Sequence, residues 1–204
     1  GVVAENTVLW RTEQVSGLWS QPEQISETGR YVDSLDADGP AVIWVESDET
    51  DELSAMLTSA DVMARINGVT TQLTQGEGYV YDAKISSSAN GTSALAIWFS
   101  QPDVTDAEGL FRTEGRKLMY ATFNGTTWSK PQPVNANNTI VSAAPSISQK
   151  DIFWTDENGT MSAYYYPYVW YSETVLNEIG ISAHEDDYTA AMTAEGLSIW
   201  KDKS

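Results

Sequence analysis

The sequence predicts an all-β fold of the β-propeller class, with four blades of four strands each. The first indication is a short apolar phrase that ends in Trp and recurs four times, at Trp44, Trp98, Trp154 and Trp200. Its intervals of 54, 56 and 46 residues match a repeat of about 50 residues, the length of one four-stranded blade. The second indication is that several segments alternate apolar and polar residues, whereas no segment has a convincing helical period.

Each blade is expected to start with two strands, A and B, joined by a short turn. Strand A carries a large apolar residue followed by Asp, Ser or Thr, and strand B ends in the repeated Trp. The four copies of strand A are expected at 33–36, 83–86, 145–148 and 190–193. The four copies of strand B are expected around 42–44, 96–98, 152–154 and 198–200. The regular recurrence of the Trp predicts that these side chains form the core between blades.

Two further strands, C and D, complete each expected blade. Strand C is expected at 8–10, 62–65, 117–120 and 161–164. Strand D is expected at 19–22, 71–73, 128–131 and 170–172. Asn67-Gly68 and Asn124-Gly125 occupy the same position of the repeat, between C and D. Because Asn-Gly is the preferred two-residue hairpin turn, both pairs predict tight turns.

The strand order suggests a single propeller domain over residues 1–204. The chain starts at a C strand and ends at a B strand, so the C-terminal A and B strands can pair with the N-terminal C and D strands. Such pairing would close a four-bladed ring without exposed half-blades. Four blades lie at the small end of the propeller range. The alternatives are therefore that the chain is a fragment of a larger ring, or half of a ring that a second copy closes.

Composition restricts the class of partner. The net charge is −18, from 29 acidic and 11 basic residues, which argues against nucleic acid or an anionic membrane as a partner. No apolar run is long enough for membrane insertion, and the absence of cysteine excludes disulfides and thiolate chemistry.

Asn-X-Thr sequons occur at Asn90, Asn124, Asn137 and Asn158. We therefore expect an extracellular or cell-surface location.

Two short motifs connect the chain with a known family. Residues 125–128 (Gly-Thr-Thr-Trp) and, in shortened form, 17–19 (Gly-Leu-Trp) resemble the end of the Asp-box of sialidase-like propellers. The full pattern, Ser-x-Asp-x-Gly-x-Thr-Trp, is degenerate here, because Ala121 and Phe123 stand at the Ser and Asp positions. The resemblance implies a propeller fold. It does not imply sialidase activity, since the five arginines share no repeat position and residues 111–114 (Phe-Arg-Thr-Glu) only approach the family's Phe/Tyr-Arg-Ile/Leu-Pro motif.

A candidate ligand site is expected at the mouth of the propeller channel. Strand A lines the channel, and the D-to-A and B-to-C loops share one face because neighbouring strands are antiparallel. A Tyr stands four residues before the apolar residue of strand A in three repeats, and carboxylates adjoin two of them. Tyrosine rings stack on sugars while carboxylates accept hydroxyl hydrogen bonds. The expected ligand-binding residues are Tyr31, Tyr81, Tyr188, Asp82, Asp186 and Asp187. Packing of these tyrosines between blades, with solvated carboxylates, is the alternative.

No cofactor and no catalytic residue are expected. His184 is the only histidine, so a site with several histidines within one chain is excluded. Calcium is the one metal to consider, at the carboxylate-rich segment 33–39, although its spacing differs from that of an EF-hand and Leu35 is expected to point into the core.

The expected function is therefore a non-catalytic extracellular recognition module that binds a glycan through one propeller face. A protein-interaction or structural module of a surface protein, with its acidic face against a basic partner, is the first alternative. A fragment of a glycoside hydrolase, whose missing blades carry part of the site, is the second.

Overall fold

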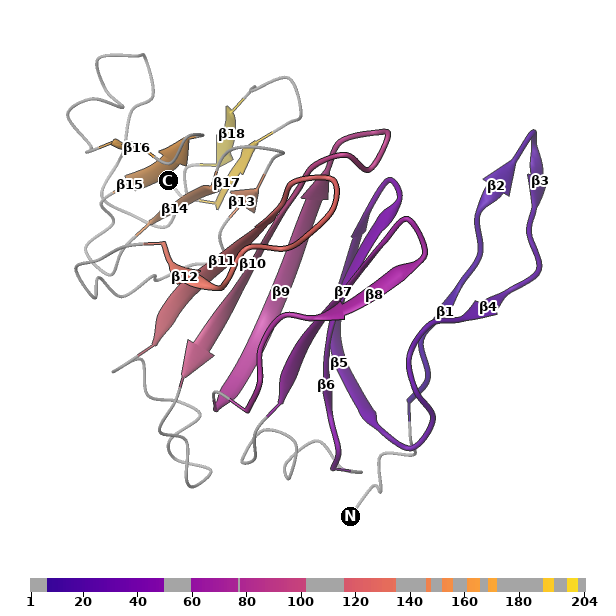
Figure 1. Ribbon diagram of the computed structural model, residues 1–204. Coiled ribbons are helices and arrows are strands. Elements are labelled where there is room, and N and C mark those ends of the chain that lie inside the picture. Colours follow the sequence, from indigo (N-terminus) through magenta and orange to yellow (C-terminus); the bar gives the residue numbers. More distant parts are fainter. Residues whose placement is uncertain are drawn as a thin grey trace.

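A computed structural model shows β-strands and their connections throughout the described part of the chain (Figure 1). The residues described are 7–49, 60–76, 78–101, 116–134, 146–147, 152–155, 161–165, 169–171, 189–192 and 198–201. Their strands form three four-stranded and three two-stranded antiparallel sheets. Over these residues, no helix with the length and apolarity of a membrane span occurs.

Each four-stranded sheet contains four strands that are consecutive in the chain. The first sheet has the order β5 (Tyr31–Asp38), β6 (Ala41–Ser47), β7 (Asp61–Ile66) and β8 (Val69–Gln72). The second has β9 (Tyr79–Ser87), β10 (Ala94–Gln101), β11 (Lys117–Phe123) and β12 (Gln132–Pro133). The third has β13 (Ser146–Ile147), β14 (Ile152–Thr155), β15 (Met161–Tyr165) and β16 (Val169–Tyr171). The predicted A–B–C–D order is thus confirmed for three repeats, but the fourth strand of the second sheet lies at Gln132–Pro133, beyond the predicted 128–131.

The two ends of the chain contain two-stranded elements. At the C-terminal end, β17 (Thr189–Met192) pairs with β18 (Ser198–Lys201), at the predicted A and B positions. At the N-terminal end, β1 (Trp10–Arg11) pairs with β4 (Glu23–Gln24). The strand pairings of the described residues include none between β1 and β18, the pair that ring closure requires.

The predicted D strand at 19–22 is displaced by an additional hairpin. A turn at Ser16-Gly17, with φ angles of 50° and 83°, joins β2 (Gln14–Val15) to β3 (Leu18–Trp19). Trp19 therefore pairs with Gln14, and the pairing with β1 begins only at β4. Figure 1 shows this hairpin extending away from the sheets.

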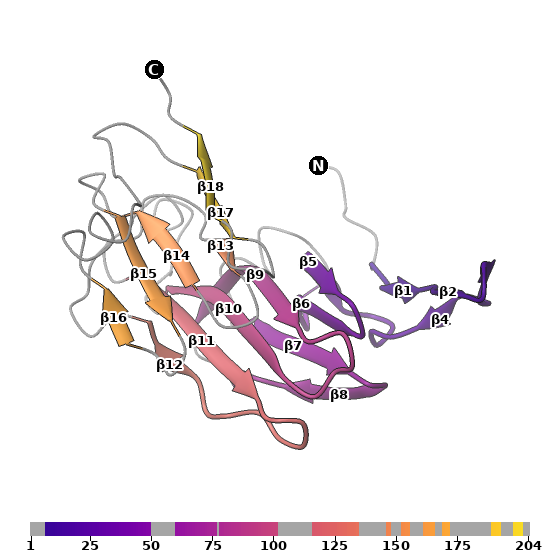
Figure 2. The same cartoon turned by 90° about the horizontal axis from the view of Figure 1, so that it is seen from above.

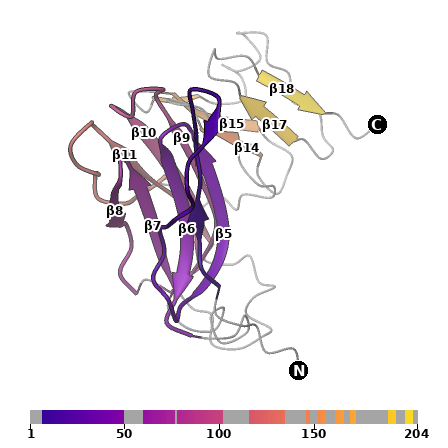
Figure 3. The same cartoon turned by 90° about the vertical axis from the view of Figure 1, so that its right-hand side faces the viewer.

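The first strands of successive sheets lie beside one another. Strand β5 contacts β9, β9 contacts β13, and β13 contacts β17, so the sheets follow one another in chain order (Figures 2 and 3). The second strand of each of the first two sheets is buried along its whole length. Trp44 and Trp98 are fully buried there, which confirms the predicted core role for these two tryptophans. The side chains of Trp154 and Trp200 lie outside the described residues.

The first two sheets are joined by hydrogen bonds from the edge of β9 to side chains of β5. Strand β9 is an edge strand, so alternate backbone N–H groups have no partner in its own sheet. Three β5 side chains accept them: Ser34 Oγ from Ala83 at 3.1 Å, Asp36 Oδ2 from Ile85 at 3.0 Å, and Asp38 Oδ2 from Ser87 at 2.8 Å. The Ser or Asp residues of strand A thus satisfy backbone donors of the next sheet.

The expectation that Leu35 points into the core is wrong. The register of β5 against β6 shifts between Asp33 and Leu35, which marks a β-bulge at Ser34 with a φ of 35°. After this extra residue, each side chain lies on the opposite face of the sheet from the one it would occupy in a strand without a bulge. Leu35 is consequently 58% exposed. A matching irregularity in β9, opposite Trp98, places Asp82 at a φ of 50°.

Candidate functional site

The predicted face forms at the end of the sheets where β5 and β9 begin. Glu46 pairs with Asp61 across β6 and β7, and Tyr31 pairs with Ser47 across β5 and β6. Tyr79 begins β9 beside them. Carboxylates and tyrosines of the first two sheets thus share one end, because antiparallel strands bring the D-to-A and B-to-C connections to the same side.

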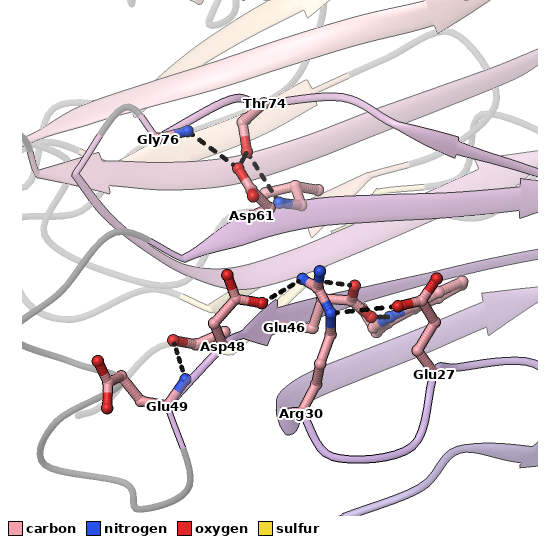
Figure 4. Close-up of polar contacts among 11 residues, drawn as sticks. Glu27, Arg30, Glu46, Asp48, Glu49, Asp61, Thr74 and Gly76 are labelled. Atoms are coloured by element: carbon pink, nitrogen blue, oxygen red, sulfur yellow. Dashed lines mark hydrogen bonds and ion pairs between the residues drawn. The ribbon is translucent and has the colours of Figure 1, made fainter.

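One arginine is surrounded by three carboxylates on this face (Figure 4). Arg30 Nη1 lies 3.3 Å from Glu46 Oε1 and 3.0 Å from Asp48 Oδ1, and its Nε lies 3.5 Å from Glu27 Oε2. Glu46 is only 4% exposed, and its Oε2 accepts a hydrogen bond from Trp44 Nε1 at 2.8 Å. Both oxygens of this buried carboxylate are therefore engaged, and the group as a whole has an excess of negative charge.

Asp61 holds the segment that leads into β9 (Figure 4). Its Oδ1 accepts hydrogen bonds from Thr74 Oγ1 at 3.3 Å and from the backbone N–H of Gly76 at 3.1 Å. The Thr74 hydroxyl oxygen in turn accepts from the Val62 N–H at 2.9 Å. These bonds position the connection between β8 and β9, which ends at Tyr79.

Two tyrosines share a narrow pocket between the first and second sheets. Tyr31 and Tyr79 line it together with Asp33 and Glu46, and its volume is about 10 Å³. This volume holds about one water molecule. A sugar ring cannot enter, so a glycan on this face would lie across the outer edges of the rings.

The aromatic row continues from Tyr79 into the second sheet. The rings of Tyr79 and Tyr81 are stacked, with centroids 4.7 Å apart and planes at 18°. Tyr81 is half-buried, is tilted against Phe99 at 5.3 Å, and accepts a long hydrogen bond of 3.5 Å from Arg116 Nη1. Burial raises the pKa of Tyr81, while Arg116 lowers it and Asp82 raises it further. Tyr81 is thus a neutral phenol at physiological pH.

The structure brings together part of the predicted site. Tyr31 and Tyr81 belong to one row because Tyr79, which the sequence analysis did not name, lies between them. Tyr79 precedes Tyr81 by two residues on the same strand, a spacing that places both on one face of a sheet. Asp82 is exposed in the bulge of β9. Tyr188, Asp186, Asp187 and His184 lie outside the described residues.

The segment considered for calcium has other contacts in the structure. Asp36 and Asp38 each direct Oδ2 to backbone N–H groups of β9, and Asp38 also accepts from Ser86 Oγ at 3.0 Å. Within the described part of the chain, no group of three or more His, Cys, Asp or Glu residues is placed to hold a metal ion.

Comparisons with known proteins give little further information. No protein-family model and no curated protein match the chain. Among solved structures, the chain is similar to regucalcin, a calcium-binding protein from Agrobacterium tumefaciens str. C58, with a TM-score of 0.40 and 12% sequence identity. The match covers 71% of this chain and 45% of that protein, so the chain spans less than half of its length. A likeness at this level carries no argument about ligand or fold.

Proposed function

We propose that the chain is a non-catalytic recognition module, built from propeller blades, that binds a glycan through the face carrying Tyr31, Tyr79 and Tyr81. The observation that supports this is the tyrosine row beside exposed carboxylates. Tyr79 and Tyr81 are stacked, Asp82 follows Tyr81 and is exposed, and the exposed Asp48 pairs with Arg30 at the end of the sheets where Tyr31 lies. Ring edges offer apolar contact to a pyranose, and the carboxylates accept hydrogen bonds from its hydroxyl groups.

The contacts of the acidic residues favour binding over catalysis. A glycoside hydrolase requires one carboxyl group as proton donor and a second as base or nucleophile. On the described part of this face, Glu46 is bound by Trp44 and Arg30, and Asp61 holds Thr74 and Gly76. Neither of these two carboxylates is available to a substrate as a proton donor or a nucleophile in this arrangement.

A glycan array tests the proposal, run with calcium and with chelator. We expect a specific hit whose affinity changes little with salt, because an uncharged glycan forms no ion pair with this face. Tyr31→Ala and Tyr79→Ala should remove binding, and Tyr31→Phe should retain the ring contact. A folded wild-type chain that binds no glycan, or binding that survives both Ala variants, would refute the proposal.

A protein-interaction role is the second candidate, favoured by the N-terminal hairpin. Trp10, Val15, Leu18 and Trp19 are 58%, 57%, 76% and 68% exposed, which concentrates apolar surface on β1 to β3. Apolar patches of this kind mark interaction sites.

We place the module outside the cell or at its surface, in agreement with the exposed sequon residues Asn90 and Asn124. Cell fractionation and a glycosidase-dependent mass shift test this location.

We also propose that a blade forms from β17, β18, β1 and β4. The segment containing β1 and β4 already packs on the first sheet as a preceding blade would, through Leu9 and Ile25 against Val42 and Trp44. Trp10 occupies the position of Met63 and Met119, which pair with Trp44 and Trp98, so its partner in this blade would be Trp200. Because the chain has no cysteine, Trp10→Cys with Trp200→Cys gives a clean cross-linking test. An intramolecular disulfide would support closure within one chain, and a covalent dimer would support closure by a second copy. Absence of both products under oxidising conditions would refute the shared blade.

A further inference from the structure

We propose that a groove between the first and second sheets binds an extended peptide segment with apolar side chains, at a site distinct from the tyrosine face. The groove has a volume of about 650 Å³, within the usual range of about 300–1,000 Å³ for ligand sites. One wall comes from the end of β7, from β8 and from the residue after it, and includes Ile66, Val69 and Leu73. The other comes from Phe123 and the segment from Gly125 to Pro131.

The chemistry of the walls differs from that of the rest of the chain. Large apolar side chains from both sheets line the groove, accompanied by hydroxyl and amide groups. Lys130 is the one charged lining residue, although the chain has 29 carboxylates. The groove therefore favours an apolar, uncharged ligand segment, and the acidic surroundings would repel an anionic one.

Strand β8 supplies the second argument for an extended peptide. It pairs only with β7 among the described strands and forms the edge of the first sheet. Half of the backbone N–H and C=O groups of an edge strand point away from its neighbour and are open to another strand. A peptide lying along β8 would hydrogen-bond to this edge and insert alternate side chains into the groove.

The two walls are already held together at one end. Asn67 Nδ2, in the turn between β7 and β8, donates a hydrogen bond to the Gly91 carbonyl oxygen at 3.0 Å. Thr92, the residue after Gly91, lies close to the other wall. A Cβ atom added at Gly125 would be 3.0 Å from the Thr92 carbonyl oxygen, so the two backbones approach closely. The turn containing Gly91 and Thr92 thus contacts both walls, and a preformed groove reduces the ordering cost of binding.

The exposed surface of the groove suits a peptide better than a sugar. Trp128, its largest aromatic residue, is half-buried and packs against Phe123 at 5.4 Å and against the core of the first two sheets. The most exposed large apolar side chain in the lining is instead the aliphatic Val69, at 65%. An aliphatic surface offers no stacking platform for a pyranose, whereas an apolar peptide side chain gains by covering it.

A peptide selection followed by matched variants tests the proposal. A phage-displayed library of random linear peptides is selected on the folded chain, and an enriched peptide is synthesised with a fluorescent label. Val69→Glu and Thr127→Glu, one in each wall, should weaken its binding about tenfold or more, because a carboxylate would be placed against apolar ligand groups. Thr70→Glu is the control, since Thr70 is also exposed on β8 but does not line the groove.

The outcomes separate this site from the tyrosine face. Tyr31→Ala should leave peptide binding unchanged even if it abolishes glycan binding. Absence of any enriched peptide, unchanged binding to Val69→Glu, or equal loss with Thr70→Glu would overturn the proposal. A glycan that binds the wild type and is lost with Val69→Glu but not with Tyr31→Ala would overturn it in favour of a saccharide groove.

Discussion

Replacing Asp36 by Ala tests whether side chains of β5 hold the first two sheets together. Asp36 Oδ2 accepts a hydrogen bond of 3.0 Å from the backbone N–H of Ile85, a buried residue on the edge of the second sheet. Asp36→Ala removes the acceptor and leaves a buried donor without a partner. A hydrogen bond to a charged group contributes about 1.5–3 kcal/mol, and an unsatisfied buried donor costs about 1–3 kcal/mol.

We therefore expect Asp36→Ala to lower the free energy of unfolding by about 2 kcal/mol. For a chain of this size the midpoint of thermal unfolding should fall by about 4–8 °C. Asp36→Asn is the matched control, because the amide oxygen can still accept from Ile85 while the charge is lost. We expect it to lower the free energy of unfolding by only about 1 kcal/mol, the difference between a hydrogen bond to a charged acceptor and one to a neutral acceptor.

Urea unfolding followed by Trp fluorescence measures these changes, and hydrogen exchange of the Ile85 amide reports the bond itself. In the wild type this amide should exchange slowly, and in Asp36→Ala it should exchange much faster than neighbouring amides of β9. The reasoning fails if Asp36→Ala changes the free energy of unfolding by less than about 0.5 kcal/mol and the Ile85 amide keeps its protection.

Three further substitutions test other parts of the structure. Burial raises the pKa of the Tyr81 phenol above the usual value of about 10. The contribution of this group to the free energy of unfolding is therefore complete below about pH 10 and is lost as the pH rises through the raised folded pKa. In urea unfolding across alkaline pH, the free energy of unfolding of Tyr81→Phe should decline less than that of the wild type. Gly91→Ala would collide with the Asn67 amide at a φ of 65°, so the melting temperature should fall and should partly recover when Asn67→Gly is added; no recovery would contradict the contact. Ile97→Ala, in the core between the second and third sheets, should cost about 2–5 kcal/mol by urea unfolding, and a loss below about 1 kcal/mol would contradict that burial.

The face proposed for ligand binding was only partly predictable. The position of Tyr31 and Tyr81 relative to strand A was visible in the repeat. Their partners were not. Arg30 precedes β5 and pairs with Glu46 near the end of β6, and Arg116 reaches Tyr81 from 35 residues away. Such contacts depend on how separate strands are brought together, which no local pattern encodes.

The sequence by itself determined the first three strands of each four-stranded sheet, their order and the turn at Asn67-Gly68. The buried Trp44 and Trp98 follow from the repeat, and Asn67-Gly68 adopts φ angles of 51° and 82°, as an Asn-Gly hairpin turn requires. These features are local, since alternation and turn chemistry act within a few residues.

Only the tertiary structure decided what the polar residues of strand A do. A bulge at Ser34 turns Leu35 outward, and Asp36 satisfies an N–H group of the next sheet about 50 residues away. The same holds for the groove beside Val69, which exists only because two sheets meet with β8 at the edge of one of them. The physical reason is that unpaired edge groups and the spaces between sheets are properties of neighbouring sheets, and a single strand does not specify its neighbour.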